Sequence, residues 1–155
     1  MLVNGDQYKG DNYRSGEFGH MCVEWHGRLC ACGKRGCLEA YCSAQRLSDD
    51  LNISLEEFFS ELEKGNAEYE QVWNEFLRHL AVGIHNIRMV LDCEIVLGGY
   101  LTEFLKPRMP ELCAALAELD PFDSECTYVR ISRYTKYSSM LGVALYFIRD
   151  FLNSI

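Results

Sequence analysis

Apolar residues recur at three- and four-residue intervals over residues 68–91, which predicts one long amphipathic helix. The members of this stripe are Tyr69, Val72, Trp73, Phe76, Leu77, Leu80, Ile84, Ile87 and Leu91. A helix of this length extends about 36 Å at 1.5 Å per residue, which is enough to cross a small domain. We therefore expect it to be the central helix and to organise the core.

Shorter helical signals precede the long helix. Residues 38–47 predict one helix, and Ser54 followed by Glu57 is a capping-box start for a second helix that runs to about Lys64. Gly65-Asn66 then ends this second helix. Residues 38–92 are thus expected to form the helical part of the chain.

Strands and helices alternate after the long helix. Residues 94–99 predict a short buried strand that ends in Gly98-Gly99. Three further elements are predicted, an amphipathic helical segment (102–119), a strand (128–131) and a terminal helix (138–152). The alternation over residues 94–153 predicts a mixed α/β domain.

The first forty residues contain seven glycines between short apolar pieces, which predicts strands and loops rather than helices. Asn4-Gly5 is typical of a two-residue hairpin turn, with Leu2-Val3 as the end of a strand. With 155 residues the chain has room for one domain. We expect that single domain to span residues 1–155 and to include a distinct loop over residues 16–39.

Charge and composition exclude several functional classes. The chain carries 15 Lys and Arg against 23 Asp and Glu, a net charge of −8, and such a surface repels nucleic-acid phosphates. No segment approaches the ~20 apolar residues that span a bilayer, and no basic leader precedes an apolar run. We therefore expect a cytoplasmic protein that binds neither DNA, unless another domain does so, nor a membrane.

Eight cysteines are many for a chain of this length, and three of them, Cys30, Cys32 and Cys37, lie within eight residues. Since nothing suggests export, a reducing compartment disfavours disulfides. A metal site is the better interpretation of this cluster.

The predicted ligand set is His20, Cys30, Cys32 and Cys37, and Gly33 and Gly36 let the backbone fold around the ion. Cys3His with no open position is the composition of a structural zinc site. Two alternatives stay open: Cys22 or His26 replaces a ligand, or the thiols are simply buried beside an unrelated histidine. The remaining cysteines are expected to be small core residues, namely Cys42, Cys93, Cys113 and Cys126.

Residues 16–20 (Gly-Glu-Phe-Gly-His) and residues 30–39 (Cys-Ala-Cys-Gly-Lys-Arg-Gly-Cys-Leu-Glu) resemble the signature of the ROK family of sugar kinases and sugar-responsive repressors. The resemblance continues through Ala40-Tyr41-Cys42-Ser43, the long helix, the strand end at Gly98-Gly99 and the last helix. The resemblance covers nearly the whole of this chain but only the C-terminal half of a typical protein of the family. It implies the second lobe of an actin-like, ribonuclease-H-like ATPase fold, with a zinc-bound loop.

The resemblance also implies a site. The residues matching the four predicted ligands hold zinc in this family, and those matching Glu17, His20 and Glu39 line the sugar pocket. The residues matching Gly98 and Gly99 approach the adenosine of ATP in the kinases. Tyr100 follows the glycine pair where a small residue is usual, and this departure puts ATP binding in doubt.

The sequence lacks the features that a complete kinase of this architecture needs. It contains no Asp-x-Gly-Thr-like phosphate loop, and no Asn-Asp pair precedes the signature to supply the base. We therefore expect no catalysis by this chain on its own, only weak binding of a sugar or amino sugar, and self-association into a homo-oligomer.

Three functions are compatible with these observations. Ser43-Ala44-Gln45-Arg46-Leu47 resembles repressors of the family, which favours the carbohydrate-sensing domain of a transcriptional repressor whose DNA contacts belong to another domain. The alternative is the C-terminal lobe of an ATP-dependent sugar or amino-sugar kinase. The third is a zinc-stapled interaction domain.

Overall fold

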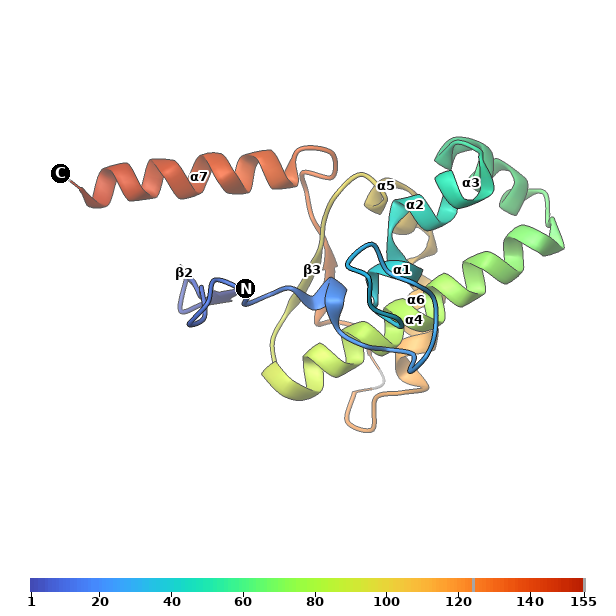
Figure 1. Cartoon of the computed structure of the whole chain (residues 1–155), viewed down its shortest axis with the longest axis horizontal. Helices are drawn as coiled ribbons and strands as arrows, with labels where there is room; N and C mark the ends of the chain where they lie inside the picture. Colours follow the sequence, from blue (N-terminus) through green and yellow to red (C-terminus); the bar gives the residue numbers. More distant parts are fainter. Residues whose placement is uncertain (124, 155) are drawn as a thin grey trace.

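The computed structural model describes residues 1–123 and 125–154 and is built around one long helix, α4 (Ala67–Leu91), which crosses the body of the molecule (Figure 1). The predicted central helix is confirmed. Asn66 begins it by accepting the N–H of Glu68 at 3.2 Å, and Asp92 in the left-handed conformation ends it. The largest fully buried side chains come from α4 and its neighbours and are Leu47, Phe58, Trp73, Phe76, Ile84, Leu112 and Leu116.

Three helices precede α4, namely α1 (Glu39–Cys42), α2 (Ala44–Leu47) and α3 (Leu55–Glu63), with a 3-10 turn η2 (Asp49–Leu51) between the last two. The capping box at Ser54 and Glu57 is present as predicted, and Lys64 is the C-cap of α3, which agrees with the predicted end. The single helix predicted over residues 38–47 is wrong. Ser43 adopts an extended conformation there and caps α2 with its side chain, which splits the segment in two.

The only sheet in the described part of the body is a parallel pair, β3 (Ile95–Leu97) and β4 (Val129–Ile131), in which Ile95 lies opposite Val129 and Leu97 opposite Ile131. Both strands are near their predicted positions. The expectation of a buried strand over residues 94–99 is wrong, because Val96 is 61% exposed and its neighbours in β3 are only half-buried. A strand with a single partner leaves one edge unpaired, and the exposure of Val96 shows that one face of β3 is uncovered.

The connection between these strands consists of α5 (Thr102–Leu105), the 3-10 turn η3 (Lys106–Arg108) and α6 (Met109–Ala117). The helix predicted over residues 102–119 is therefore interrupted. Pro107 and Pro110 lack the N–H that a continuous helix requires, and each lies at the start of a new helical element. Helix α6 packs against α4 and buries Leu112 and Leu116.

The last helix, α7 (Ser138–Asn153), and the hairpin of β1 (Leu2–Val3) and β2 (Asp6–Gln7) extend together from one side of the body (Figure 1). The hairpin confirms the predicted Asn4-Gly5 turn, in which both residues have positive φ. Arg149 of α7 donates to the carbonyl of Gly5 at 2.6 Å and pairs with Asp6. These contacts join the two ends of the described chain.

Cys113 of α6 and Cys126, which precedes β4, form a disulfide. This corrects the expectation that all four remaining cysteines are separate core residues. The two cysteines are 13 residues apart in the sequence, and the packing of α6 beside β4 brings their Cα atoms to 5.3 Å. Cys42 and Cys93 are free and half-buried.

None of the helices in the described ranges has both the length and the apolar character needed to cross a membrane.

Candidate functional site

The loop that holds the predicted ligands begins with the 3-10 turn η1 (Phe18–His20) and returns to the start of α1. Two isolated antiparallel bridges, Cys22 with Cys37 and Leu29 with Arg35, fold it back on itself. Gly36 has a φ of +80°, and a Cβ atom there would lie 1.8 Å from the Glu24 carbonyl oxygen. Only glycine allows this close crossing of the loop.

The structure brings His20, Cys30, Cys32 and Cys37 together, with one donor atom from each lying within 4.8 Å of the others. The Sγ atoms of Cys32 and Cys37 are 3.7 Å apart, and His20 Nδ1 is 3.9 Å from Cys30 Sγ. Zinc–sulfur bonds of 2.3 Å in a tetrahedron require a sulfur–sulfur distance of about 3.8 Å. Donor types and spacing therefore fit a closed zinc site.

Two of the three thiols of this cluster, Cys30 and Cys37, have a raised pKa and resist ionisation when no cation is present. Burial and, after it, the adjacent sulfurs of Cys32 and Cys30 together raise the pKa of Cys37 to about 12. By contrast, the backbone N–H of Lys34 lowers the pKa of Cys32. Three neighbouring thiolates need a compensating positive charge, which a divalent cation supplies.

The two alternative ligands lie outside this cluster. Cys22 is exposed and pairs with Cys37 through a backbone bridge, while His26 is exposed and packs edge-on to Trp25. Among the described residues, neither joins the group of converging donors.

The three residues implied for sugar binding are close to the cluster. Glu39 is the first residue of α1, and its Oε2 atom lies 3.6 Å from His20 Nδ1 and 3.5 Å from Cys30 Sγ. Glu17 is one turn of η1 before His20, whose N–H donates to the Glu17 carbonyl at 3.0 Å. The His20 and Glu39 side chains are 45% and 49% exposed, so they are accessible to a ligand.

Gly98 and Gly99 lie elsewhere, at the C-terminal end of β3. The N–H of Gly99 donates to Ser138 Oγ at 3.0 Å, and its carbonyl accepts from Thr102 Oγ1 at 2.5 Å. Gly99 has a φ of +95°, and a Cβ atom on Gly98 would lie 3.1 Å from Ser138 Oγ. The local turn accounts for both glycines without a nucleotide.

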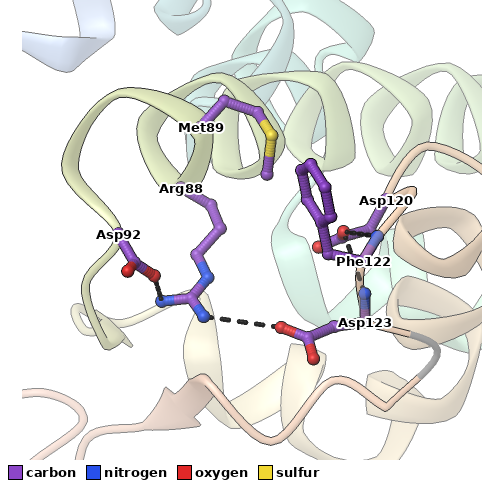
Figure 2. Close-up of a pocket in the computed structure, with 6 residues that line it drawn as sticks. All are labelled: Arg88, Met89, Asp92, Asp120, Phe122 and Asp123. Atoms are coloured by element: carbon purple, nitrogen blue, oxygen red, sulfur yellow. Dashed lines mark hydrogen bonds and ion pairs between the residues drawn. The ribbon is translucent and has the colours of Figure 1, made fainter.

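An open pocket separate from this loop lies between the C-terminal end of α4 and the segment after α6 (Figure 2). Arg88 crosses it and pairs with Asp92 at 2.8 Å and with Asp123 at 3.4 Å. The N–H groups of Phe122 and Asp123 lower the pKa of Asp120. The charged groups of this pocket satisfy one another, so we assign it a structural role.

The sequence pattern predicted no residue of α4 in the site. The structure places His79 of α4 under the loop, buried and in contact with Tyr41. A histidine among helical apolar positions gives only a weak signal in a sequence.

Comparison with known proteins agrees with this picture. The model of the ROK family matches residues 1–150. N-acetylmannosamine kinase of Vibrio cholerae serotype O1 (strain El Tor Inaba N16961) is 31% identical over 105 residues, which are 64% of this chain and 37% of that protein. N-acetyl-D-glucosamine kinase of Salmonella paratyphi B is 29% identical over 121 residues, 67% of this chain and 40% of that protein.

Solved structures show the same fold. The ROK hexokinase of Thermus thermophilus superposes with a TM-score of 0.82 at 24% identity, over 96% of this chain and 53% of that one. A ROK family glucokinase of Streptomyces griseus, in complex with glucose and AMPPNP, superposes with a TM-score of 0.61 at 20% identity. The match covers 84% of this chain and 49% of that one. These likenesses confirm the predicted α/β fold of the actin-like ATPase kind. The chain spans less than half the length of the curated relatives and about half of the solved ones.

Proposed function

The chain belongs to the ROK family, and on that premise we propose that it is the C-terminal, carbohydrate-binding lobe of a ROK protein of the sugar-kinase type. One observation carries the proposal. His20 and Glu39, on two separate elements, meet at the edge of the cysteine cluster with their polar atoms open to solvent. Adjacent hydroxyl groups of a sugar require such a convergent set of acceptors and donors.

His20, Cys30, Cys32 and Cys37 would hold a zinc ion, which when bound fixes the four side chains in one tetrahedral arrangement. His20 Nδ1 lies on the side of Cys30, which leaves Nε2 of the same ring for a sugar hydroxyl. A ring held in one orientation meets that hydroxyl at little entropic cost. Glu39 and Glu17 accept hydrogen bonds from neighbouring hydroxyls.

The exposed face of α7 supports the interpretation as one lobe. Large apolar side chains line two adjacent stripes of this helix and are 38–69% exposed, namely Met140, Leu141, Val143, Leu145, Phe147, Ile148, Phe151 and Leu152. An apolar helix face of this size requires a cover. We propose that the other half of the actin-like fold covers it, because the solved relatives contain a comparable length of additional chain.

The kinase type is favoured over the repressor type by the names of the curated relatives, an N-acetylmannosamine kinase and an N-acetyl-D-glucosamine kinase. The segment that suggested a repressor has a folding role here. Ser43 caps α2, and Arg46 is buried and pairs with Glu75 at 2.9 Å. Amino sugars are accordingly the substrate class that we propose.

Affinity of this lobe alone is expected to be weak. Each hydrogen bond in an open, wet half-site contributes about 0.5 to 1.5 kcal/mol. Three to five such bonds barely offset an association cost of roughly 4 kcal/mol or more. We therefore expect millimolar dissociation constants and no sugar-dependent ATP hydrolysis by the chain alone.

Titration of the 15N-labelled, zinc-loaded chain with N-acetylmannosamine and N-acetylglucosamine tests this proposal by NMR. Amide shifts are expected at residues 17–20 and around Glu39, with saturation in the millimolar range. Glu39→Gln should weaken them several-fold, whereas Glu118→Gln, which changes an exposed carboxylate at the C-cap of α6, should not. Unchanged spectra well above millimolar sugar, or shifts only elsewhere, would refute the sugar site.

A further inference from the structure

The metal-binding loop packs against one face of α4. Glu75, His79 and Gly83 are spaced four residues apart and therefore lie on the same side of the helix. Each of them meets a residue from the segment between Glu24 and Arg46. The contacts differ in kind, and His79 makes the central ones.

His79 is 3% exposed, and its Nδ1 atom lies 2.8 Å from the carbonyl oxygen of Glu75 in the preceding turn. Because a carbonyl only accepts, Nδ1 carries the proton and donates it. Nε2 is buried, has no hydrogen-bond partner among the described residues, and faces Glu24 Oε2 at 3.6 Å. The α4 helix thus fixes the orientation of the ring.

Tyr41 covers the flat side of this ring. The two rings stack with centroids 3.8 Å apart and planes inclined by 12°. The Tyr41 hydroxyl accepts the N–H of Arg28 at 2.8 Å, and a Cβ atom on Gly27 would lie 2.1 Å from the hydroxyl oxygen. Tyr41 therefore connects His79 with the middle of the loop.

The contacts of His79 lie at the two ends of the segment that carries the cysteine ligands. His79 touches Glu24 on one side and Tyr41 on the other, and the segment between them contains all three cysteine ligands. Two neighbouring contacts on α4 add to this. Leu38, inside the segment, packs on Gly83, where a Cβ atom would lie 2.6 Å from the Leu38 Cδ2 atom, and Arg46, which follows the segment in α2, pairs with Glu75. The loop has few core residues of its own, so its conformation depends on these contacts with α4.

We propose that His79 is a positioning residue for the metal site: by stacking on Tyr41 and lying against Glu24 it closes the segment that carries Cys30, Cys32 and Cys37 before the ion binds. The inference rests on the metal site of the proposed function. Preorganisation lowers the conformational entropy lost on binding. Outer residues of this kind typically change metal affinity by about 10- to 100-fold.

The test compares Zn²⁺ affinity, measured by competition with a chromogenic chelator, in the full chain and its variants. His79→Ala should bind Zn²⁺ about 10- to 100-fold more weakly. His79→Phe keeps a ring that stacks on Tyr41 and should therefore recover part of this loss. The same variant provides the comparison if His79→Ala fails to fold. His85→Ala is the matched control, because His85 is a half-buried histidine of the same helix near Asp120 and should leave the affinity unchanged.

Two further readouts separate positioning from ligation and from general stability. At saturating Co²⁺ the thiolate charge-transfer bands of His79→Ala should equal those of the parent chain, because His79 is no ligand. In the metal-free chain, amide hydrogen exchange over residues 24–41 should be faster in His79→Ala than in His85→Ala. Equal Zn²⁺ affinities of parent and His79→Ala, or equal exchange rates, would overturn the proposal.

If the parent chain binds no metal, the metal site of the proposed function is wrong. The hydrogen-exchange comparison then still decides whether His79 orders the loop, so the two failures are distinguishable.

Discussion

The Sγ atoms of Cys32 and Cys37 lie 3.7 Å apart, too far for a disulfide bond and close to the spacing of two thiolates on one zinc ion. Cys113 and Cys126, in contrast, are joined. One chain therefore holds two pairs of neighbouring cysteines with different chemistry. The surroundings explain the difference, because only the first pair has a third thiol and a histidine beside it.

Removal of zinc is expected to destabilise the protein. At free zinc a hundredfold above the dissociation constant, binding adds about 2.7 kcal/mol to the free energy of unfolding, which corresponds to a Tm shift of roughly 5 to 10 °C for a chain of this size. Calorimetry with and without chelator measures it. Cys32→Ala should abolish the shift and Cys22→Ala should preserve it. A parent chain that melts at the same temperature with and without zinc, or a full shift in Cys32→Ala, would speak against the site.

Zinc binding is expected to release at least two protons at pH 7. Cys37 has a pKa of about 12, and Cys30 also has a raised pKa, so both thiols are protonated in the metal-free chain and must ionise to become ligands. Zinc affinity should therefore fall as the pH is lowered. Calorimetric titrations in buffers of different ionisation enthalpy count the protons, and a count of zero would contradict thiolate ligation by these two residues.

In the metal-free chain the same raised pKa of Cys37 predicts the opposite trend on the alkaline side. Its folded pKa exceeds that of the unfolded chain, so the folded state holds the proton longer and loses stability as the pH rises above about 9. Burial raises the pKa of Cys42 and adds to this effect. Denaturant titrations between pH 7 and pH 10 should show this loss in Cys22→Ala and less of it in Cys42→Ala.

Reduction of the Cys113–Cys126 disulfide is expected to cost about 3 kcal/mol, because it frees a closed loop of moderate length in the unfolded state. Thiol titration of the metal-free, denatured chain should find six free cysteines before reduction and eight after it. Eight thiols before reduction, in protein purified without reductant, would argue against the bond.

Self-association of the isolated chain is expected through the uncovered face of α7. Phe147→Glu or Phe151→Glu should shift sedimentation towards monomer, since each places a charge in the apolar stripe. Val90→Glu is the control, because Val90 is 80% exposed and belongs to the last turn of α4 rather than to α7. A parent chain that is monomeric at high micromolar concentration would contradict this prediction.

Local signals in the sequence were sufficient for much of the fold. The hairpin at Asn4-Gly5, the capping box at Ser54 and the periodicity of α4 depend on neighbours within a few residues, and each is found in its predicted place. The break at Ser43 was also readable, since serine is a strong N-cap residue. It was missed because the apolar pattern continues across it.

Features that depend on tertiary packing were not predictable in the same way. The disulfide requires α6 to lie beside the approach to β4, and the partial exposure of β3 depends on whether another element packs on the face that carries Val96. The ligand cluster was found because its spacing is short and its residue types are rare. His79 was missed because its importance arises from stacking on Tyr41, which is distant in sequence.

The central claim is that residues 16–39 form a closed zinc centre of three sulfurs and one nitrogen that presents His20 and Glu39 to a sugar. X-ray absorption at the zinc edge of the purified chain tests it most directly. We predict about one zinc per chain, with three sulfur neighbours at about 2.3 Å and one nitrogen at about 2.0 to 2.1 Å. A first shell dominated by oxygen or nitrogen, or protein that binds no zinc after incubation with it, would contradict the claim.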